Sequence, residues 1–258
     1  MARTPDGPPP PPAVQKLRVR WAKRGRLRFT SHRDFQRAFE RAVRRAGLPV
    51  AYSAGFSPHP KISYAGAAPT GTASEAEYVE VSVTTRVDPA EVARLLDAAM
   101  PPGLDVLEVV EAAPGAGSLA DRLQASHWRI ELPGTAAAQA EEAVAAFLAS
   151  PEVLVERLTK DGTRTFDARG AVLRLSAGSE PEREPCAILH VVVRHGTPTV
   201  RPDDVLSGLR RTGILVTPAP PVAVRLAQGP LDEPTGEVGD PLAPDRNAVG
   251  APLAVGGA

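Results

Sequence analysis

The sequence predicts an α+β protein with two tandem ferredoxin-like domains, each with the element order βαββαβ. Strand-like and helix-like segments follow one another in this order twice along the chain. The length of 258 residues suits two domains of ordinary size, each with its own core. A stretch rich in Pro, Gly and Ala separates the two halves. We therefore expect a disordered Pro-rich arm at 1–15, a first domain at 16–111, a linker at 112–121, a second domain at 122–228 and a disordered tail at 229–258.

The helix expected from about His32 to Ala46 has the clearest periodicity in the first domain. Its apolar residues, including Phe35 and Phe39, recur at spacings of three and four and so share one face. Ser31 is a natural N-cap and Gly47 a natural stop. The other elements expected in this domain are a strand at 16–21 that continues after a turn at 23–25 to residue 30, an extended segment at 48–64, a strand at 77–84, a helix at 88–100 and a strand at 104–110.

The second domain is expected to repeat this plan without obvious sequence identity to the first. Alternating strand-like runs and two helix-like runs follow one another in the required order. The expected elements are a strand at 127–132, a helix at 136–149, a hairpin at 154–175, a strand at 187–195, a helix at 202–212 and a strand at 222–226.

Neither end of the chain has the apolar periodicity of a folded element. The run from Pro8 to Pro12 favours an extended arm, and the residues from Gly229 onward are rich in Gly, Pro and Asp. No apolar stretch approaches the roughly 20 residues that span a bilayer, and the N-terminus lacks the pattern of a signal peptide. We expect a soluble, cytoplasmic protein with no membrane partner.

A single cysteine, Cys186, excludes an internal disulfide and a cysteine-ligated cluster made by this chain alone. It lies in a strand-like apolar run, which favours a packing role. The five histidines show no ligand spacing, so we expect no metal site and no cofactor in this chain.

Positive charge is concentrated in one segment, although the whole chain has a formal net charge of zero. Between Lys16 and Tyr64 there are 13 basic residues and only two acidic ones, Asp34 and Glu40, which gives a local charge of +11. An excess of this kind favours an anionic partner, and RNA is the partner that we expect.

The helix face opposite the core carries Arg33, Arg37, Arg41 and Arg44 at spacings of three and four. Glu40 is the only acidic residue in the second half of this helix, so the face is not the mixed-sign surface typical of a solvated helix. Guanidinium groups one turn apart suit a phosphate backbone, which they bind bidentately. A purely solubilising arginine face is the alternative.

The start of the same helix is the second candidate feature. The exposed N–H groups and the positive end of the helix dipole favour an anion near Ser31 and His32. His32 is a candidate to contact that anion or to transfer a proton. A simple polar surface role for this histidine is the alternative.

The third feature is the segment from Ala51 to Tyr64, which is rich in hydroxyls, aromatic rings, Gly and Pro. Aromatic side chains on such a loop stack bases of single-stranded RNA, while basic side chains meet phosphates. A core position for at least one of the aromatic rings is the alternative. Across all three features, the candidate RNA-binding or anion-binding residues are Arg28, Ser31, His32, Arg37, Arg41, Arg44, Tyr52, Ser53, Phe56, His59, Lys61 and Tyr64.

Four segments closely resemble the radical-SAM-associated protein family: residues 26–34, Arg41-Ala42, residues 48–63 and Glu77-Tyr78. The resemblance is dense over about 16–110 and looser to about 226, and Arg33 departs from it, because the family has an apolar residue there. Members occur alone or fused behind a radical-SAM enzyme domain. The resemblance implies an accessory role beside such an enzyme in RNA or ribosome-linked modification. S-adenosylmethionine and the iron–sulfur cluster would belong to that radical-SAM partner, because this chain lacks a Cys-x-x-x-Cys-x-x-Cys motif.

Three functions are therefore open at this point. The first is an accessory protein that binds RNA or presents a substrate to a separate radical-SAM enzyme, with no activity of its own. The second is a metal-independent endoribonuclease with His32 as general acid or base, because tandem ferredoxin-like domains resemble in outline the repeat-processing ribonucleases of CRISPR systems. The third is a protein-docking module whose basic face meets an acidic partner.

Overall fold

The computed structural model describes residues 9–160, 162–180, 185–213 and 215–249. The chain forms two compact units, each assembled from separated segments. The first combines residues 1–71, 76–121 and 241–258, and the second combines residues 72–75 and 122–240. Both units contain helices and sheet strands, which confirms the α+β class. Most of the predicted N-terminal arm and the last nine residues of the predicted tail lie outside the described residues.

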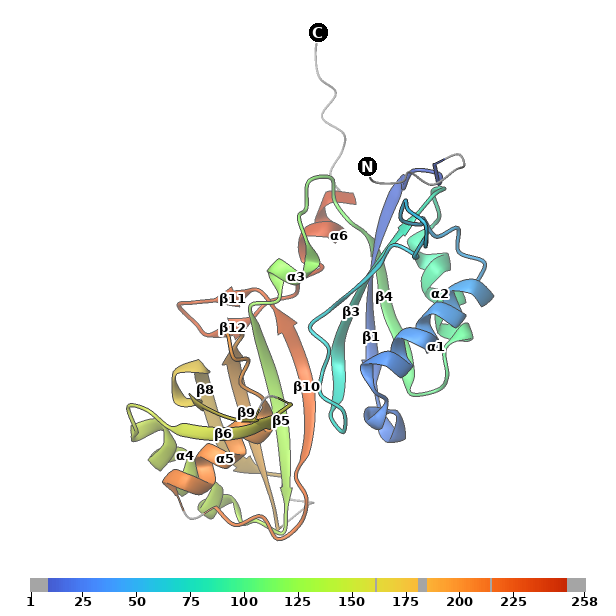
Figure 1. Ribbon diagram of the computed structural model, residues 1–258. Coiled ribbons are helices and arrows are strands. Elements are labelled where there is room, and N and C mark those ends of the chain that lie inside the picture. The colour runs from blue at the N-terminus through green and yellow to red at the C-terminus, as the bar shows by residue number, and fades with distance from the viewer. Residues whose placement is uncertain (1–8, 161, 181–184, 214, 250–258) are drawn as a thin grey trace. The chain divides into compact units, whose positions relative to one another are not determined.

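The sheet of the first unit has the strand order β4-β1-β3-β2. β1 pairs antiparallel with β4, and β2 pairs antiparallel with β3. Helices α1 and α2 lie side by side (Figure 1). The elements of the first unit, in chain order, are β1 (Gln15–Lys23), a 3-10 helix η1 (Gly25–Phe29), α1 (His32–Arg45), β2 (Ile62–Ala65), β3 (Ala73–Val83), α2 (Pro89–Ala99), β4 (Leu104–Glu111), α3 (Leu119–Arg122) and α6 (Ala243–Val249).

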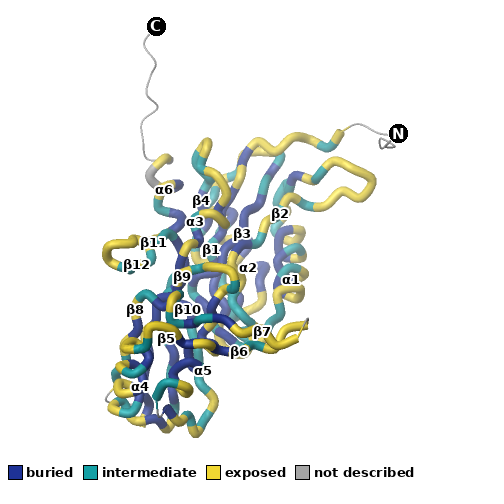
Figure 2. The backbone as a smooth tube through the Cα atoms, turned by 60° about the vertical axis from the view of Figure 1, so that its left-hand side comes forward, coloured by how far each residue is buried: buried dark blue, intermediate teal, exposed yellow. Residues whose placement is uncertain are grey.

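Helix α1 confirms the helix predicted from His32, and its apolar face is buried. Buried and exposed residues alternate along it in Figure 2. Phe39 is fully buried, and the ring of Phe35 stacks on Trp21 of β1 with 3.5 Å between the ring centroids. These contacts fix α1 on the sheet, so its arginine-bearing side remains exposed.

The segment after β1 corrects one prediction. Where the sequence indicated a strand continuing to Thr30, the structure has the 3-10 helix η1. Gly25 has φ of 53°, a conformation that glycine adopts without strain, and it turns the chain out of β1. The amide of Leu27 then donates to the carbonyl of Arg24, and the amide of Thr30 donates to the carbonyl of Leu27.

The C-terminal segment also differs from the prediction of a disordered tail from Gly229. The strands β11 (Leu231–Asp232) and β12 (Glu237–Val238) form a hairpin, and α6 follows them. Leu242 and Asp245 are fully buried in the first unit. The sequence did not predict this helix, because the segment contains few large apolar residues. A buried ion pair between Asp245 and Arg18 helps to hold the helix in place instead.

The sheet of the second unit has the strand order β10-β5-β9-β8. Residues 72–75, which include the first three residues of β3, belong to this unit, and Ala73 pairs in parallel with Val224 of β10. The predicted hairpin at 154–175 is shorter than expected, and its last part is a separate sheet strand. The bounds are β5 (Ala125–Pro133), α4 (Ala137–Ala149), β6 (Leu154–Thr159), β7 (Gly162–Asp167), a 3-10 helix η2 (Arg169–Ala171), β8 (Val172–Ser179), β9 (Cys186–Arg194), α5 (Pro202–Thr212) and β10 (Val222–Gly229).

The two units share one strand order when the β6–β7 hairpin is set aside. In each, the fourth strand of the unit neighbours the first, the first neighbours the third, and the third neighbours the second. Among the described residues, no helix is long and apolar enough to cross a membrane.

Candidate nucleic-acid interface

The exposed side of α1 carries Arg33, Arg37, Arg41 and Arg44, as the sequence predicted. Asp34 is 3.8 Å from the guanidinium of Arg37, and both side chains are largely exposed to water. An exposed pair of this kind contributes only about 0–1 kcal/mol, because water screens both charges. The pair therefore does not commit Arg37 to Asp34 when an anion approaches.

Asp34 of α1 forms hydrogen bonds with Ser31, the N-cap residue of the same helix. The Oγ atom of Ser31 accepts a hydrogen bond from the amide of Asp34 at 3.2 Å and donates one to the carboxylate of Asp34 at 2.7 Å. The Asp34 carboxylate thus supplies the negative charge that the helix dipole favours at this end. The neighbouring His32 is exposed, and its ring edge meets the ring of Tyr64 at a centroid distance of 5.5 Å. An anion at this helix start stays a prediction.

Tyr64 lies inside an aromatic cluster rather than on an open surface. Its ring makes edge contacts with Phe35 and Phe39, at centroid distances of 5.9 and 6.2 Å. Its hydroxyl is buried and has no hydrogen-bond partner among the described residues. Burial, followed by the charge of Glu40, raises the pKa of this phenol well above its ordinary value. This position does not suit the predicted base stacking by Tyr64.

The loop between α1 and β2 presents two exposed aromatic side chains. Tyr52 is 44% exposed and Phe56 is 67% exposed. The amide of Ser53 donates to the carbonyl of His59 at 2.8 Å, and the amide of His59 donates to the Ser53 hydroxyl at 3.0 Å. The Ser53 hydroxyl therefore helps to close the loop. His59 and Lys61 are exposed beside it.

A pocket of about 200 Å³ is lined by residues of both α1 and this loop. Glu40 and Arg44 from α1, Tyr52 from the loop and Ile62 from β2 are among its lining residues. The pocket combines apolar walls with one carboxylate, one guanidinium and one exposed aromatic ring. The structure thus brings Arg44 and Tyr52, two of the predicted residues, to one hollow.

Arg28 lies in η1 and is only partly exposed. Its guanidinium carbon is 4.8 Å from the centroid of the Phe29 ring, which is itself exposed. The Nε atom of Arg28 is buried without a hydrogen-bond partner among the described residues. Phe29 is an exposed aromatic residue that the sequence interpretation missed, because a strand position was expected there.

Several cations in the basic segment serve the fold, so the local charge of +11 overstates the exposed charge. Arg18 is fully buried between Glu80 and Asp245. The Nζ atom of Lys23 donates to two backbone carbonyls, and the guanidinium of Arg45 donates to the carbonyl of Ala99 at 3.1 Å. The exposed arginines of α1 thus form the main part of the remaining basic surface.

Within the ranges that the structure describes, no group of three or more His, Cys, Asp or Glu side chains is placed to hold a metal ion. Cys186 is buried, as a packing role requires.

Comparisons with known proteins give one informative match. None of the curated proteins compared with the chain matches it. Among solved structures, DyPB from Rhodococcus jostii RHA1 matches at 14% identity over 78% of this chain and 84% of that chain, with a TM-score of 0.19, which is too low to carry an argument. A profile described as an uncharacterised protein conserved in bacteria (DUF2344) matches residues 16–202. The match spans more than half of the chain, and the chain therefore belongs to this bacterial family.

Proposed function

We propose that this protein is an accessory RNA-binding protein that presents RNA to a separate radical-SAM enzyme. The observation that carries the RNA part is that Arg44 of α1 and the exposed ring of Tyr52 line one pocket. The other arginines of α1 and the ring of Phe56 are also exposed. Arg44 and Tyr52 line the same pocket, so a phosphate and a neighbouring base have partners within one short stretch of surface.

Single-stranded RNA fits this chemistry better than a duplex does. Stacking on an aromatic ring requires an unpaired base, and every base has a face that stacks. Arginine binds phosphate bidentately and keeps its charge at any cellular pH. The Tyr52 and Phe56 rings would hold bases, and Arg37, Arg41 and Arg44 would follow the backbone.

The radical-SAM part rests on the resemblance of residues 26–34 and 48–63 to the radical-SAM-associated family. The chain has one cysteine, and an iron–sulfur cluster of a radical-SAM enzyme requires three or more cysteine ligands. S-adenosylmethionine and the cluster would therefore belong to the partner. The chain would bind RNA and position it.

We also propose that both units are ferredoxin-like. The shared strand order supports this assignment, with the β6–β7 hairpin as an insertion in the second unit.

Charge reversal on α1 tests the RNA-binding proposal. The variant R37E/R41E/R44E is compared with K160E/R164E/R211E, which makes the same change in net charge at exposed positions of the second unit. Fluorescence anisotropy with a labelled single-stranded RNA at low salt should show strong loss of affinity for the first variant and near wild-type affinity for the second. Equal affinities for both variants would remove the proposal.

The partner is tested by co-purification with a radical-SAM enzyme encoded beside this gene, after nuclease treatment. An association that needs RNA supports the presenting role. An association that survives the nuclease but is lost in R37E/R41E/R44E would instead identify α1 as a protein-docking surface.

A further inference from the structure

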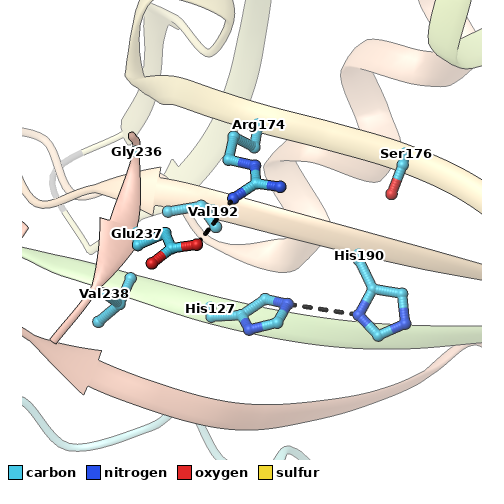
Figure 3. A pocket seen from close by; sticks show the side chains of 8 residues that line it. All are labelled: His127, Arg174, Ser176, His190, Val192, Gly236, Glu237 and Val238. Carbon is cyan, nitrogen blue, oxygen red and sulfur yellow. Dashed lines mark hydrogen bonds and ion pairs between the residues drawn. The ribbon is translucent and has the colours of Figure 1, made fainter. Parts of the chain in front are cut away.

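A polar pocket of about 450 Å³ lies in the second unit, where the β11–β12 hairpin meets the sheet. Figure 3 shows side chains from several strands directed toward it. The polar ones are His127 from β5, His190 from β9, Arg174 and Ser176 from β8 and Glu237 from β12. The sequence interpretation assigned no site here.

Strand register explains why these side chains meet. Val192 of β9 pairs with His127 on one side and with Arg174 on the other. His190, two residues earlier, pairs with Ser176. Side chains directly opposite one another, and those two residues apart on a strand, share a face of the sheet. The pairing of β5, β9 and β8 therefore fixes this polar cluster on one face.

The two histidines form a hydrogen-bonded pair. The Nε2 atom of His127 is 3.3 Å from the Nδ1 atom of His190. When both rings are neutral, one ring donates to the other in either tautomer, which leaves the pair one free N–H and one free lone pair. Burial, and then the nearby His190 and Arg174, lower the pKa of His127. Neutral His127 is therefore favoured, and the pair gains a donor when a bound anion favours protonation of His127.

Arg174 is the cation best placed to receive an anion. Its guanidinium is 3.9 Å from the carboxylate of Glu237, and both side chains are more than half exposed. A long, exposed ion pair of this kind is weak, so an incoming dianion competes with it successfully. Arg129 is also on this face of β5, but its charge is balanced by ion pairs with Glu131 and Glu180.

We propose that this pocket binds a phosphate monoester, with the phosphoryl group held by Arg174, His190 and His127. The volume of the pocket exceeds that of a phosphate ion, so a small organic group occupies the remainder. The Ser176 hydroxyl is a further donor at the pocket wall. Binding is coupled to proton uptake by His127, and affinity rises as the pH falls below neutrality.

Titration of the full chain tests this site with two probes. Sulfate serves as the first, because it is a dianion from pH 5.5 to 8, so any pH dependence comes from the protein. Ribose 5-phosphate is the second, with ribose as its control. We expect saturable binding of both anions, shifts of the His127 and His190 imidazole NMR signals, and at least a severalfold gain in sulfate affinity from pH 8 to pH 5.5.

The variants R174Q and H190Q are compared with R164Q, which changes an exposed arginine outside the pocket. Loss of a charge-assisted hydrogen bond weakens binding by about tenfold or more. R174Q and H190Q should show this loss, and R164Q should bind like the wild type. If sulfate bound but ribose 5-phosphate bound no better than ribose, the ligand would be free phosphate rather than a phosphate monoester. The proposal is overturned if neither anion shifts the imidazole signals, or if R174Q and H190Q bind both anions as the wild type does.

Discussion

Arg18 of β1 and Asp245 of α6 form a fully buried ion pair across 227 positions of the sequence. The Nη1 atom of Arg18 is 2.9 and 2.8 Å from the two carboxylate oxygens of Asp245. The Nε atom of Arg18 also donates to Glu80 at 3.0 Å, and the carboxylate of Asp245 accepts from the amide of Ala113 at 3.0 Å. This contact joins the C-terminal helix to the first strand of the first unit, and it removes one arginine from the basic surface.

Removal of the Asp245 carboxylate should therefore destabilise the first unit. The variant D245A leaves the buried Arg18 with one carboxylate fewer, and breaking a buried pair costs about 3–5 kcal/mol. Urea denaturation followed by circular dichroism measures the loss. The control E91A removes a carboxylate from an exposed pair with Arg94 and should leave stability nearly unchanged, because water screens this pair. Equal effects of the two substitutions would show that α6 is not held by this pair.

The buried hydroxyl of Tyr64 predicts an unusual outcome for a core substitution. Because this hydroxyl lacks a partner in the described part of the chain, Y64F removes an unsatisfied polar atom and keeps the ring. We expect unchanged or increased stability, by about 1 kcal/mol at most. RNA affinity measured on the same variant should equal that of the wild type. A large loss of RNA affinity in Y64F would show that the phenol reaches the ligand.

The exposed ring of Phe56 should behave in the opposite way. Its side chain is 67% exposed, so F56A should leave the melting temperature nearly unchanged. Loss of one stacked base costs about 1–3 kcal/mol, so RNA affinity should fall by about fivefold or more. Exposed Leu158 of the second unit offers the matched control L158A. An F56A protein with full affinity would exclude this ring from the interface.

The half-buried His195, which directly follows β9, predicts how stability depends on pH. His195 Nδ1 lies 2.7 Å from the carbonyl of Leu123, and its Nε2 lies 2.5 Å from the Ser126 hydroxyl. Burial lowers the pKa of His195, the hydrogen bond to the Leu123 carbonyl offsets part of this effect, and the charge of Arg225 lowers the pKa further. The unfolded chain therefore binds a proton more readily than the folded chain, and stability is lost as the pH falls below the ordinary histidine pKa of about 6.5.

Urea denaturation at pH 8, 7, 6 and 5 should show this decline. In H195Q, which keeps a donor and an acceptor but does not titrate, the decline should be smaller over the same range. The exposed His59 provides the control H59Q, whose profile should follow the wild type. Parallel profiles for H195Q and the wild type would contradict the assignment.

The endoribonuclease alternative makes a separate prediction about His32. A partner for acid and base catalysis would have to be near it, yet the neighbouring Tyr64 keeps its hydroxyl buried and its pKa raised by burial. We expect labelled RNA incubated with the protein in EDTA to stay intact. A cleavage product that is formed by the wild type but not by H32A would support the endoribonuclease function rather than the accessory role.

Local patterns predicted the parts of the fold that depend on local physics. The apolar spacing of Phe35 and Phe39, with the cap at Ser31, located α1 to within one residue at each end. The exposure of the arginines on α1 followed from the same spacing. Helix α6 was missed because its order depends on Asp245 finding Arg18, a contact that no local window contains.

The second-unit pocket was missed for a related reason. His127 and His190 are 63 residues apart, and only the register between β5 and β9 places them side by side. Period-two alternation along β5 was a usable signal, because it puts His127 and Arg129 on the face opposite the buried Trp128 and Ile130. Tyr64 was misplaced because an aromatic residue beside a polar loop has the same local pattern whether its ring stacks on a base or on the core.

The most direct test of the central proposal is the salt dependence of RNA binding. Each arginine that neutralises a phosphate of a single strand contributes about 0.7 to the slope of log affinity against log salt concentration. We predict that R37Q/R41Q/R44Q has a slope shallower than that of the wild type by about 2, while K160Q/R164Q/R211Q keeps the wild-type slope. If R37Q/R41Q/R44Q and the wild type gave the same slope, the arginines of α1 would not contact RNA, and the proposed function would be wrong.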